Sequence, residues 1–347
     1  MRVATVCLLV RFVFVCDAAA QEPLRVGPIT AAPGTVVSGT LEVTAREGDQ
    51  GTMLPVTVIN GSKPGPVLAL VAGVHGQEYT PVLALQRLRT AIDPASLSGA
   101  VIMVHVANMP SYLARTIYYS PADGKNLNRV FPGRADGTLS ERIADVITRE
   151  VIDRATHVVD LHCGDGNESL RPYTYWITTG PPDVAEAGRQ MALAFGMDRI
   201  VVDRERPVDP KASVYLSNTG VTRGKPALTI ESGGMAQTDN ESIARIERGV
   251  AGLLRHLKMR ADGPAPVTKP VLFDRSEVVR SNFTGIFYGA VEKGQTVAAG
   301  AVIGRVTDFH GKVLEEFKAP FAGEVLYIIG TPAMNKGEPV VFIAATR

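Results

Sequence analysis

The sequence contains few cysteines and no excess of charge of either sign. Of its 3 cysteines, Cys7 and Cys16 fall in the first 20 residues, so a chain that loses this segment keeps only Cys163 and can form no internal disulfide. The 36 Lys and Arg residues and 35 Asp and Glu residues leave a formal net charge of +1, without a concentrated basic run. This balance gives no electrostatic reason to expect nucleic acid or a membrane surface as partner, and it favours small or neutral partners.

The N-terminal apolar stretch is too short and too interrupted to span a membrane. It reads MRVATVCLLVRFVFVCDAAAQEP, with an early arginine, an apolar stretch broken by Arg11 and a small-residue AAAQ site. These features resemble a secretory signal peptide cut near Ala20, and we expect export to the periplasm or secretion. The alternatives are a misplaced start codon or an apolar cytosolic leader, which would leave the protein in the cytoplasm.

The rest of the chain has the composition of a globular protein, with 45 % hydrophobic and 20 % charged residues. Residues 21–60 are β-rich. Short apolar runs typical of strands buried on both faces follow at 66–73, 101–108, 156–162, 173–179 and 227–232. Segments of helical period lie between them at 80–93, 139–154, 183–196 and 240–259. This alternation predicts an α/β fold with a mixed, largely parallel sheet covered by helices on both faces.

A proline-rich segment, ADGPAPVTKP at 261–270, predicts a join between two domains. The sequence after it is β-rich and punctuated by glycine, with a spacing that resembles the small barrel-sandwich folds of biotinyl and lipoyl carriers. The turn that would present a modifiable lysine reads DFHGKVLEE and lacks the usual Met-Lys-Met or Asp-Lys-Ala, so we expect no attached cofactor. We therefore predict a catalytic domain at 21–262 and an all-β domain at 263–347.

Two of the predicted strands deliver metal-ligand side chains to the same edge of the sheet. His75 and Glu78 follow the strand that ends at Gly73, and His162 ends the strand THVVDLH. Ligands of open α/β sheets bind at the carboxyl ends of the strands, and two His with one Glu form an open, catalytic type of zinc site. Asp160 could orient an imidazole of this site, or it could cap a neighbouring loop. The alternative interpretation is a pair of hydrogen-bonded histidines at strand ends.

Two further segments carry polar side chains suited to catalysis. Asn128 and Arg129, in the loop SPADGKNLNRVFPG, could hold a carboxylate, because guanidinium matches carboxylate oxygens in two places. An ordinary Asn turn with a solvated Arg is the alternative. Glu231 ends the buried strand at 227–232, where it could take a proton from a metal-bound water.

In this order, HGQE, DLH, NRVFPG and ESGG resemble the motifs of the succinylglutamate desuccinylase/aspartoacylase family, which belongs with the M14-type zinc carboxypeptidases. The match spans residues 55 to 260, and the C-terminal unit also resembles the second domain of the family. The resemblance implies one zinc ion per chain, bound by His75, Glu78 and His162. It implies Glu231 as general base and acid.

The same resemblance implies that Asn128 and Arg129 bind a substrate carboxylate. It makes Arg115 the counterpart of the arginine that polarises the scissile carbonyl, although the spacing between this arginine and the Asn-Arg pair varies within the family. The implied reaction is hydrolysis of an amide bond, removing a small acyl group from an N-acyl amino acid or a related N-acyl amine. The substrate is a small molecule, and the sequence is also compatible with a homo-oligomer.

Three other functions share part of this pattern. An exported M14-like metallocarboxypeptidase acting on short peptides would use the same zinc centre, but the C-terminal unit narrows the active-site entrance in the family. A two-His-one-carboxylate iron oxygenase usually carries His-x-Asp/Glu on a β-barrel, whereas Glu78 lies three residues after His75 in an α/β context. A non-catalytic zinc-binding module would be expected to lose Glu231.

Overall fold

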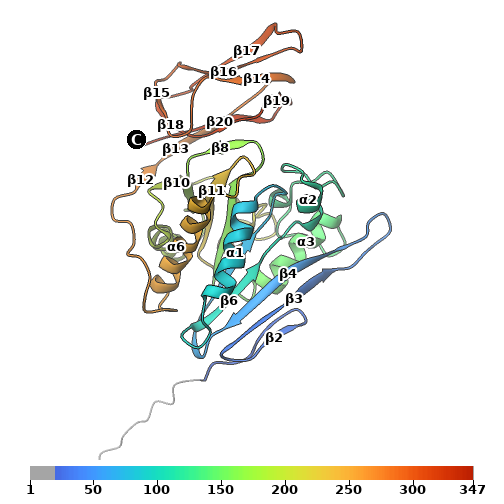
Figure 1. Ribbon diagram of the computed structural model, residues 1–347, viewed down its shortest axis with the longest axis vertical. Coiled ribbons are helices and arrows are strands. Elements are labelled where there is room, and N and C mark those ends of the chain that lie inside the picture. Colours follow the sequence, from blue (N-terminus) through green and yellow to red (C-terminus); the bar gives the residue numbers. More distant parts are fainter. Residues whose placement is uncertain (1–19, 347) are drawn as a thin grey trace, which may run out of the picture.

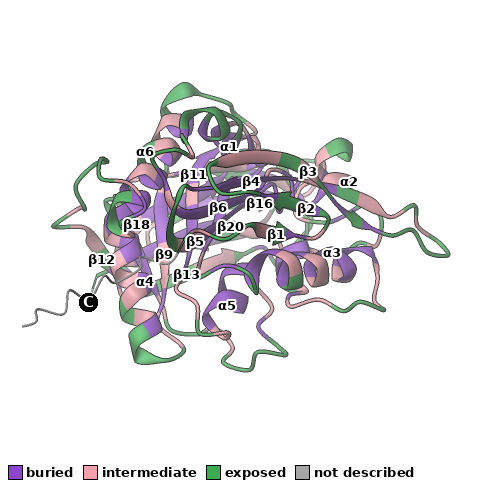
Figure 2. Ribbon diagram, turned by 90° about the horizontal axis from the view of Figure 1, so that it is seen from below, coloured by how far each residue is buried: buried purple, intermediate pink, exposed green. Residues whose placement is uncertain are grey.

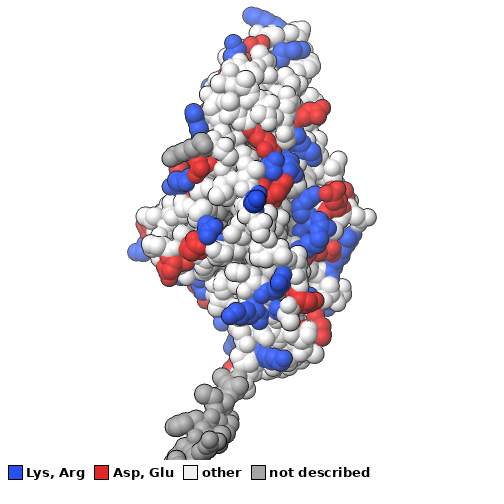
Figure 3. All heavy atoms as spheres, turned by 90° about the vertical axis from the view of Figure 1, so that its left-hand side faces the viewer, with Lys and Arg blue, Asp and Glu red and all other residues white. Residues whose placement is uncertain are grey.

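The computed structural model describes residues 20–346. The predicted signal peptide, residues 1–20, lies outside this range except for Ala20. Two parts are stacked along the long axis of the molecule, an α/β body and a smaller β unit (Figure 1). No helix in the described part of the chain is long and apolar enough to cross a membrane. Basic and acidic side chains are interspersed on the face shown in Figure 3, as the balanced composition suggests.

A mixed sheet of nine strands forms the centre of the α/β body. Four central strands, β11, β7, β5 and β6, run parallel, whereas β9 is antiparallel to β11, β4 is antiparallel to β6, and β3 is antiparallel to β4. This confirms the predicted sheet. From edge to edge the order is β12 (Val271–Phe273), β10 (Arg199–Asp203), β9 (Tyr173–Ile177), β11 (Ala227–Gly234), β7 (His157–Gly164), β5 (Lys63–Ala72), β6 (Ser98–Val104), β4 (Thr52–Asn60) and β3 (Thr35–Val43).

The alternation of side-chain direction along β5 explains why residues 67–72 are all apolar. Ala69 and Val71 belong to the core on one face of the sheet, whereas Leu68 and Leu70 belong to the core on the other. Because successive side chains of a strand point to opposite faces, both faces must be covered. Helices α1 (Tyr79–Ala91) and α6 (Asn240–His256) cover one face, and α3 (Leu139–Ile147) and α5 (Leu216–Val221) cover the other (Figure 2).

The long helices lie where the sequence period predicted them. The segment 183–196 forms α4 (Pro182–Phe195), and 139–154 forms α3 followed by a π-helical turn, η2 (Thr148–Ile152). A capping box between Thr138 and Glu141 starts α3. The elements missed in the catalytic body include the helices α2 (Met109–Ala114) and α5 and the strands β8 (Glu168–Leu170) and β10. The two helices have six residues each, too few for a helical period to be visible.

The β unit is built from two antiparallel sheets around a core that includes Ile303, Phe317 and Val325. One sheet contains β13 (Arg275–Arg280), β20 (Pro339–Ala345), β18 (Gly323–Ile329), β15 (Thr296–Val297) and, from the catalytic body, β8 (Glu168–Leu170). The other contains β17 (Val313–Lys318), β16 (Val302–Thr307), β14 (Gly285–Gly289) and β19 (Ala333–Met334). A separate hairpin, β1 (Leu24–Val26) with β2 (Ile29–Ala31), lies near the N-terminus.

The junction between the two parts lies later in the chain than residue 263. Strand β12 follows the proline-rich segment, yet it pairs with β10 and extends the nine-stranded sheet. The β unit therefore begins at β13. The catalytic body also contributes β8 to a sheet of the β unit, since β8 pairs with β18. This pairing fixes the β unit against the catalytic body.

A partly buried ion pair reinforces the junction. Arg199 Nε lies 2.9 Å from Glu324 Oε2, and the two side chains are 22 % and 13 % exposed. Arg171 approaches the same carboxylate, with 3.7 Å between its Nε and Oε1 of Glu324. Removing the carboxylate would leave both guanidinium groups with Asp198 as their remaining ion-pair partner.

We predict that Glu324→Ala lowers the free energy of unfolding by about 1.5 to 3 kcal/mol, because a hydrogen bond to a charged group is lost. Glu316→Ala is the matched control, since Glu316 lies 3.8 Å from Lys318 in an exposed pair and should contribute less than about 1 kcal/mol. Urea unfolding of both variants measures the difference. Equal losses would contradict a stabilising role for the junction pair.

Candidate active site

A cavity of about 570 Å³ lies beyond the carboxyl ends of β5, β7 and β11. Its wall includes His75, Glu78, His162 and Glu231 from the catalytic body. The β unit closes another side with Val278 and Arg280 of β13, Tyr327 of β18 and Pro339 of β20. The cavity therefore lies between the two parts and is lined by both.

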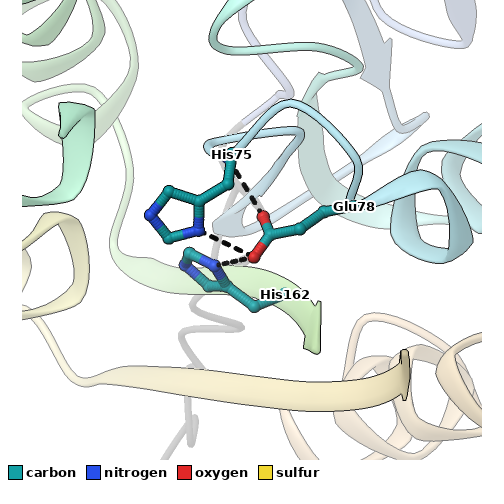
Figure 4. A group of neighbouring side chains, drawn as sticks. All are labelled: His75, Glu78 and His162. Carbon is teal, nitrogen blue, oxygen red and sulfur yellow. Dashed lines mark hydrogen bonds and ion pairs between the residues drawn. The ribbon is translucent and has the colours of Figure 1, made fainter. Parts of the chain in front are cut away.

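The three predicted metal ligands come together in this cavity (Figure 4). His75 Nδ1 and His162 Nδ1 each lie 2.8 Å from Glu78 Oε1. The other oxygen of Glu78 accepts a hydrogen bond from the backbone N–H of His75 at 3.1 Å, which fixes the loop after β5. Their ligand atoms all lie within 4.8 Å of one another, so this donor set fits a divalent cation.

The outer nitrogen of each imidazole faces a hydrogen-bond acceptor. His162 Nε2 lies 2.8 Å from Asp160 Oδ1, and His75 Nε2 lies 3.1 Å from Asn126 Oδ1. A proton held at Nε2 by such an acceptor would leave the lone pair of Nδ1 available to a metal ion bound beside Glu78. The amide nitrogen of Asn128 also lies 3.2 Å from His162 Nε2. Asp160 is fully buried, as expected for a residue that orients His162. The role of Asn126 was missed by sequence reasoning.

The charges of Glu78, His75 and His162 influence one another in a way that favours a bound cation. Burial by itself would raise the pKa of Glu78, but His162 and His75 outweigh it and lower the pKa to about 2. Burial also lowers the pKa of His162, whereas Asp160 and Glu78 raise it, with a net increase well above the usual value. The surroundings thus favour an ionised Glu78 and positive charge beside it. A bound metal ion would supply this positive charge.

Glu231 lies on the strand next to His162. Strands β11 and β7 are parallel, and Glu231 is the register partner of His162. Burial raises the pKa of Glu231 well above the usual range, although His162 opposes the increase. Within residues 20–346 its carboxylate forms no hydrogen bond or ion pair, and it faces the cavity. It is therefore free to exchange a proton with a bound molecule.

The predicted carboxylate clamp forms a short 3₁₀ turn, η1 (Leu127–Arg129). The amide of Asn128 is already engaged, since its Oδ1 accepts from Leu216 N at 2.8 Å and its Nδ2 donates to Asp160 Oδ2 at 3.2 Å. Arg129 Nη1 donates to the backbone oxygen of Asn128, and the guanidinium lies 4.7 Å from the ring centre of Tyr215. Arg129 thus offers donors to the cavity, and Asn128 supports Asp160.

Arg115 is not brought to the other site residues. It ends α2 in a left-handed backbone conformation, with φ of 56°, and its side chain is exposed. The cavity wall near this segment is formed instead by Tyr118, three residues later. The spacing of residues along this loop therefore did not predict that Tyr118, rather than Arg115, faces the cavity.

Several cavity residues were not singled out from the sequence. They are Tyr118, Asp165, Glu168, Arg206 and Tyr215. The guanidinium of Arg206 lies 3.8 Å from the ring centre of Tyr215. A signal for Asp165 and Glu168 was present, since both acids follow closely on β7, the strand that carries His162 and ends at Gly164.

Comparison with known proteins identifies the family. A model of the succinylglutamate desuccinylase/aspartoacylase catalytic domain matches residues 64–257. The chain belongs to this family. It is accordingly an amidohydrolase of the deacylase type, and the His-Glu-His group is a candidate zinc site typical of the family.

Relatives of known function or structure resemble nearly the whole chain. The N-alpha-acetyl-L-2,4-diaminobutyric acid deacetylase of Halomonas elongata is 33 % identical over 302 residues, covering 84 % of this chain and 85 % of that protein. The product-bound ectoine utilization protein EutE (DoeB) of Ruegeria pomeroyi is 27 % identical with a TM-score of 0.81, covering 94 % and 100 %. A succinylglutamate desuccinylase of Silicibacter sp. TM1040 is 25 % identical with a TM-score of 0.77, covering 89 % and 95 %.

We predict that His162→Ala abolishes tight binding of a divalent metal, because it removes one of three ligands and leaves an open site. Metal content after dialysis is the measurement. His157→Ala is the matched control, since His157 begins the same strand at its opposite end. Full metal occupancy in the His162 variant would show that the ion binds elsewhere.

Proposed function

We propose that this protein uses one zinc ion, bound by His75, Glu78 and His162, to hydrolyse the amide bond of N-acyl amino acids. The observation that carries the proposal is the convergence of both Nδ1 atoms on one Glu78 oxygen, beside the unpaired carboxylate of Glu231. When bound, zinc polarises a carbonyl group and makes water more acidic. The residues of the chain supply the remaining steps.

Glu231 acts as general base and then as general acid. Its carboxylate takes a proton from the attacking water and passes it to the leaving nitrogen. Two features support this role, namely its register beside His162 and a raised pKa, caused by burial, which makes the carboxylate a better proton acceptor.

Arg129 holds the carboxylate of the amino-acid part of the substrate. Its exposed guanidinium lines the cavity and forms no ion pair within residues 20–346, so its donors remain available. Asn128 positions Arg129 by accepting its Nη1 donor on the backbone oxygen at 2.7 Å. Arg115 lies outside the cavity wall, and we assign it no step.

The size of the cavity and the similar proteins support small substrates. The two relatives of named activity are a deacetylase of N-alpha-acetyl-L-2,4-diaminobutyric acid and a succinylglutamate desuccinylase. We therefore propose acetyl or succinyl as the acyl group. Arg280 and Tyr327 close one side of the cavity from the β unit, which disfavours the long chains that a carboxypeptidase would admit.

Export remains part of the proposal, supported by the leader at residues 1–20 alone. N-terminal sequencing of protein from the native host tests it. A chain that begins near Gln21 outside the cytoplasm supports export, and an intact Met1 in the cytosol contradicts it.

The test of the function is a hydrolysis assay of the zinc-loaded protein on N-acetyl and N-succinyl amino acids, with dipeptides in parallel. We predict that Glu231→Gln keeps its zinc but loses about 10² to 10⁴-fold in turnover, since the amide preserves size and removes the basic lone pair. Near-normal turnover in this variant would place the base elsewhere. Faster hydrolysis of dipeptides than of acyl amino acids would favour a peptidase.

A further inference from the structure

Glu168 is held rigidly on the wall of the cavity, although the proposed reaction does not use it. It begins β8, and its backbone pairs with Ile329 of β18 in the β unit. Its carbonyl oxygen accepts a hydrogen bond from Met235 N at 3.1 Å. The backbone is therefore fixed from both parts of the molecule, and the side chain lines the cavity.

The carboxylate of Glu168 lacks a cationic partner. Tyr118 OH donates to its Oε1 at 2.6 Å, and this is the hydrogen bond that the carboxylate forms within residues 20–346. No Lys, Arg or His of the same range forms an ion pair with it. Burial raises the pKa of Glu168 to about 7, although the Tyr118 hydrogen bond opposes this. An unpaired carboxylate in such a place is costly, and a ligand cation would relieve the cost.

Glu168 lies close to the metal-ligand group. The ring centre of Tyr118 is 5.9 Å from that of His75, and the hydroxyl of the same tyrosine reaches Glu168. One tyrosine side chain thus separates the carboxylate from a metal ligand. A group bound by Glu168 would belong to the same small molecule whose amide bond lies at the metal.

Three other charged groups of the cavity, Asp165, Lys125 and Arg206, are already engaged. Asp165 accepts hydrogen bonds from the backbone N–H groups of Gln77, Tyr118 and Gly166. Lys125 Nζ lies 3.1 Å from an oxygen of Glu141. The side chain of Arg206 donates to Asp203.

Among the carboxylates of this cavity, Glu78 and Glu231 serve the metal and the proton transfer. Asp165 is occupied by backbone donors. Glu168 differs from these carboxylates in two ways. Its Oε2 forms no hydrogen bond within residues 20–346, and the proposed reaction does not use it.

We propose that Glu168 binds a primary ammonium group carried by the side chain of the substrate, so that the enzyme prefers N-acyl diamino acids to N-acyl amino acids with apolar side chains. This rests on the proposed deacylase function. Arg129 holds the carboxylate of the substrate, and Glu168 holds its ammonium group. Two charged contacts of opposite sign then orient the amide bond at the metal.

The first experiment measures binding, so that it does not depend on turnover. L-2,4-diaminobutyrate and L-2-aminobutyrate differ by one amino group, and titration calorimetry gives the affinity of the zinc-loaded protein for each. Wild type should bind the diamino acid about ten- to hundredfold more tightly, as expected for a hydrogen bond to a charged group. Glu168→Gln should lose this preference and keep its affinity for L-2-aminobutyrate.

Glu292→Gln is the matched control, because Glu292 is exposed and lies outside the cavity wall. It should retain the preference, and all three proteins should contain equal amounts of zinc. Equal affinity of wild type for both compounds, or binding of neither, would overturn the proposal. An equal loss for both compounds in the Glu168 variant would also overturn it, since Glu168 would then support the cavity as a whole.

The second experiment repeats the comparison as kcat/KM on the Nα-acetyl derivatives of the same two amino acids. A preference of wild type for the diamino substrate, lost in Glu168→Gln, supports the proposal. Hydrolysis of both substrates at equal efficiency overturns the role of Glu168 and leaves the deacylase function intact. Preferential binding without hydrolysis supports ammonium recognition by Glu168 and contradicts the deacylase function.

Discussion

The contact of two imidazoles with one carboxylate oxygen of Glu78 is the interaction on which the site depends. A buried carboxylate is stable only beside positive charge, and both Nδ1 atoms lie 2.8 Å away. The two Nε2 atoms must then be held from outside, which Asp160 and Asn126 do. The polar network of the cavity follows from this one buried charge.

The parallel strands make that interaction possible. Because β5, β7 and β11 run in the same direction, their carboxyl ends bring side chains that are far apart in sequence to one edge. The register between β11 and β7 then places Glu231, the proposed proton-transfer residue, beside the metal ligand His162. The β unit completes the cavity, and the pairing of β8 with β18 across the junction fixes it there.

Most of the fold and the metal group could be predicted from the sequence, for a physical reason. Short apolar runs and helical periods reflect burial. His162 lies near the end of β7, and His75 and Glu78 lie in the short loop between β5 and α1, so their positions along the chain define their positions in space. The short helices α2 and α5 lacked a visible period. The strand β12 could not be assigned to the nine-stranded sheet, because pairing across a proline-rich join depends on tertiary contacts.

The loops around the cavity could not be predicted in the same way. Between Arg115 and Tyr118 the backbone takes two left-handed residues, so the side chain that reaches the cavity is decided by local dihedral angles rather than by spacing. Glu168 reaches its place through pairing with β18, about 160 residues later in the chain. The proposed metal-binding and proton-transfer residues thus lie at or just beyond the carboxyl ends of strands. The residues proposed to bind the substrate lie in loops and at the junction with the β unit. Relatives that share the fold can therefore retain one reaction while they differ in the acyl amino acid they accept.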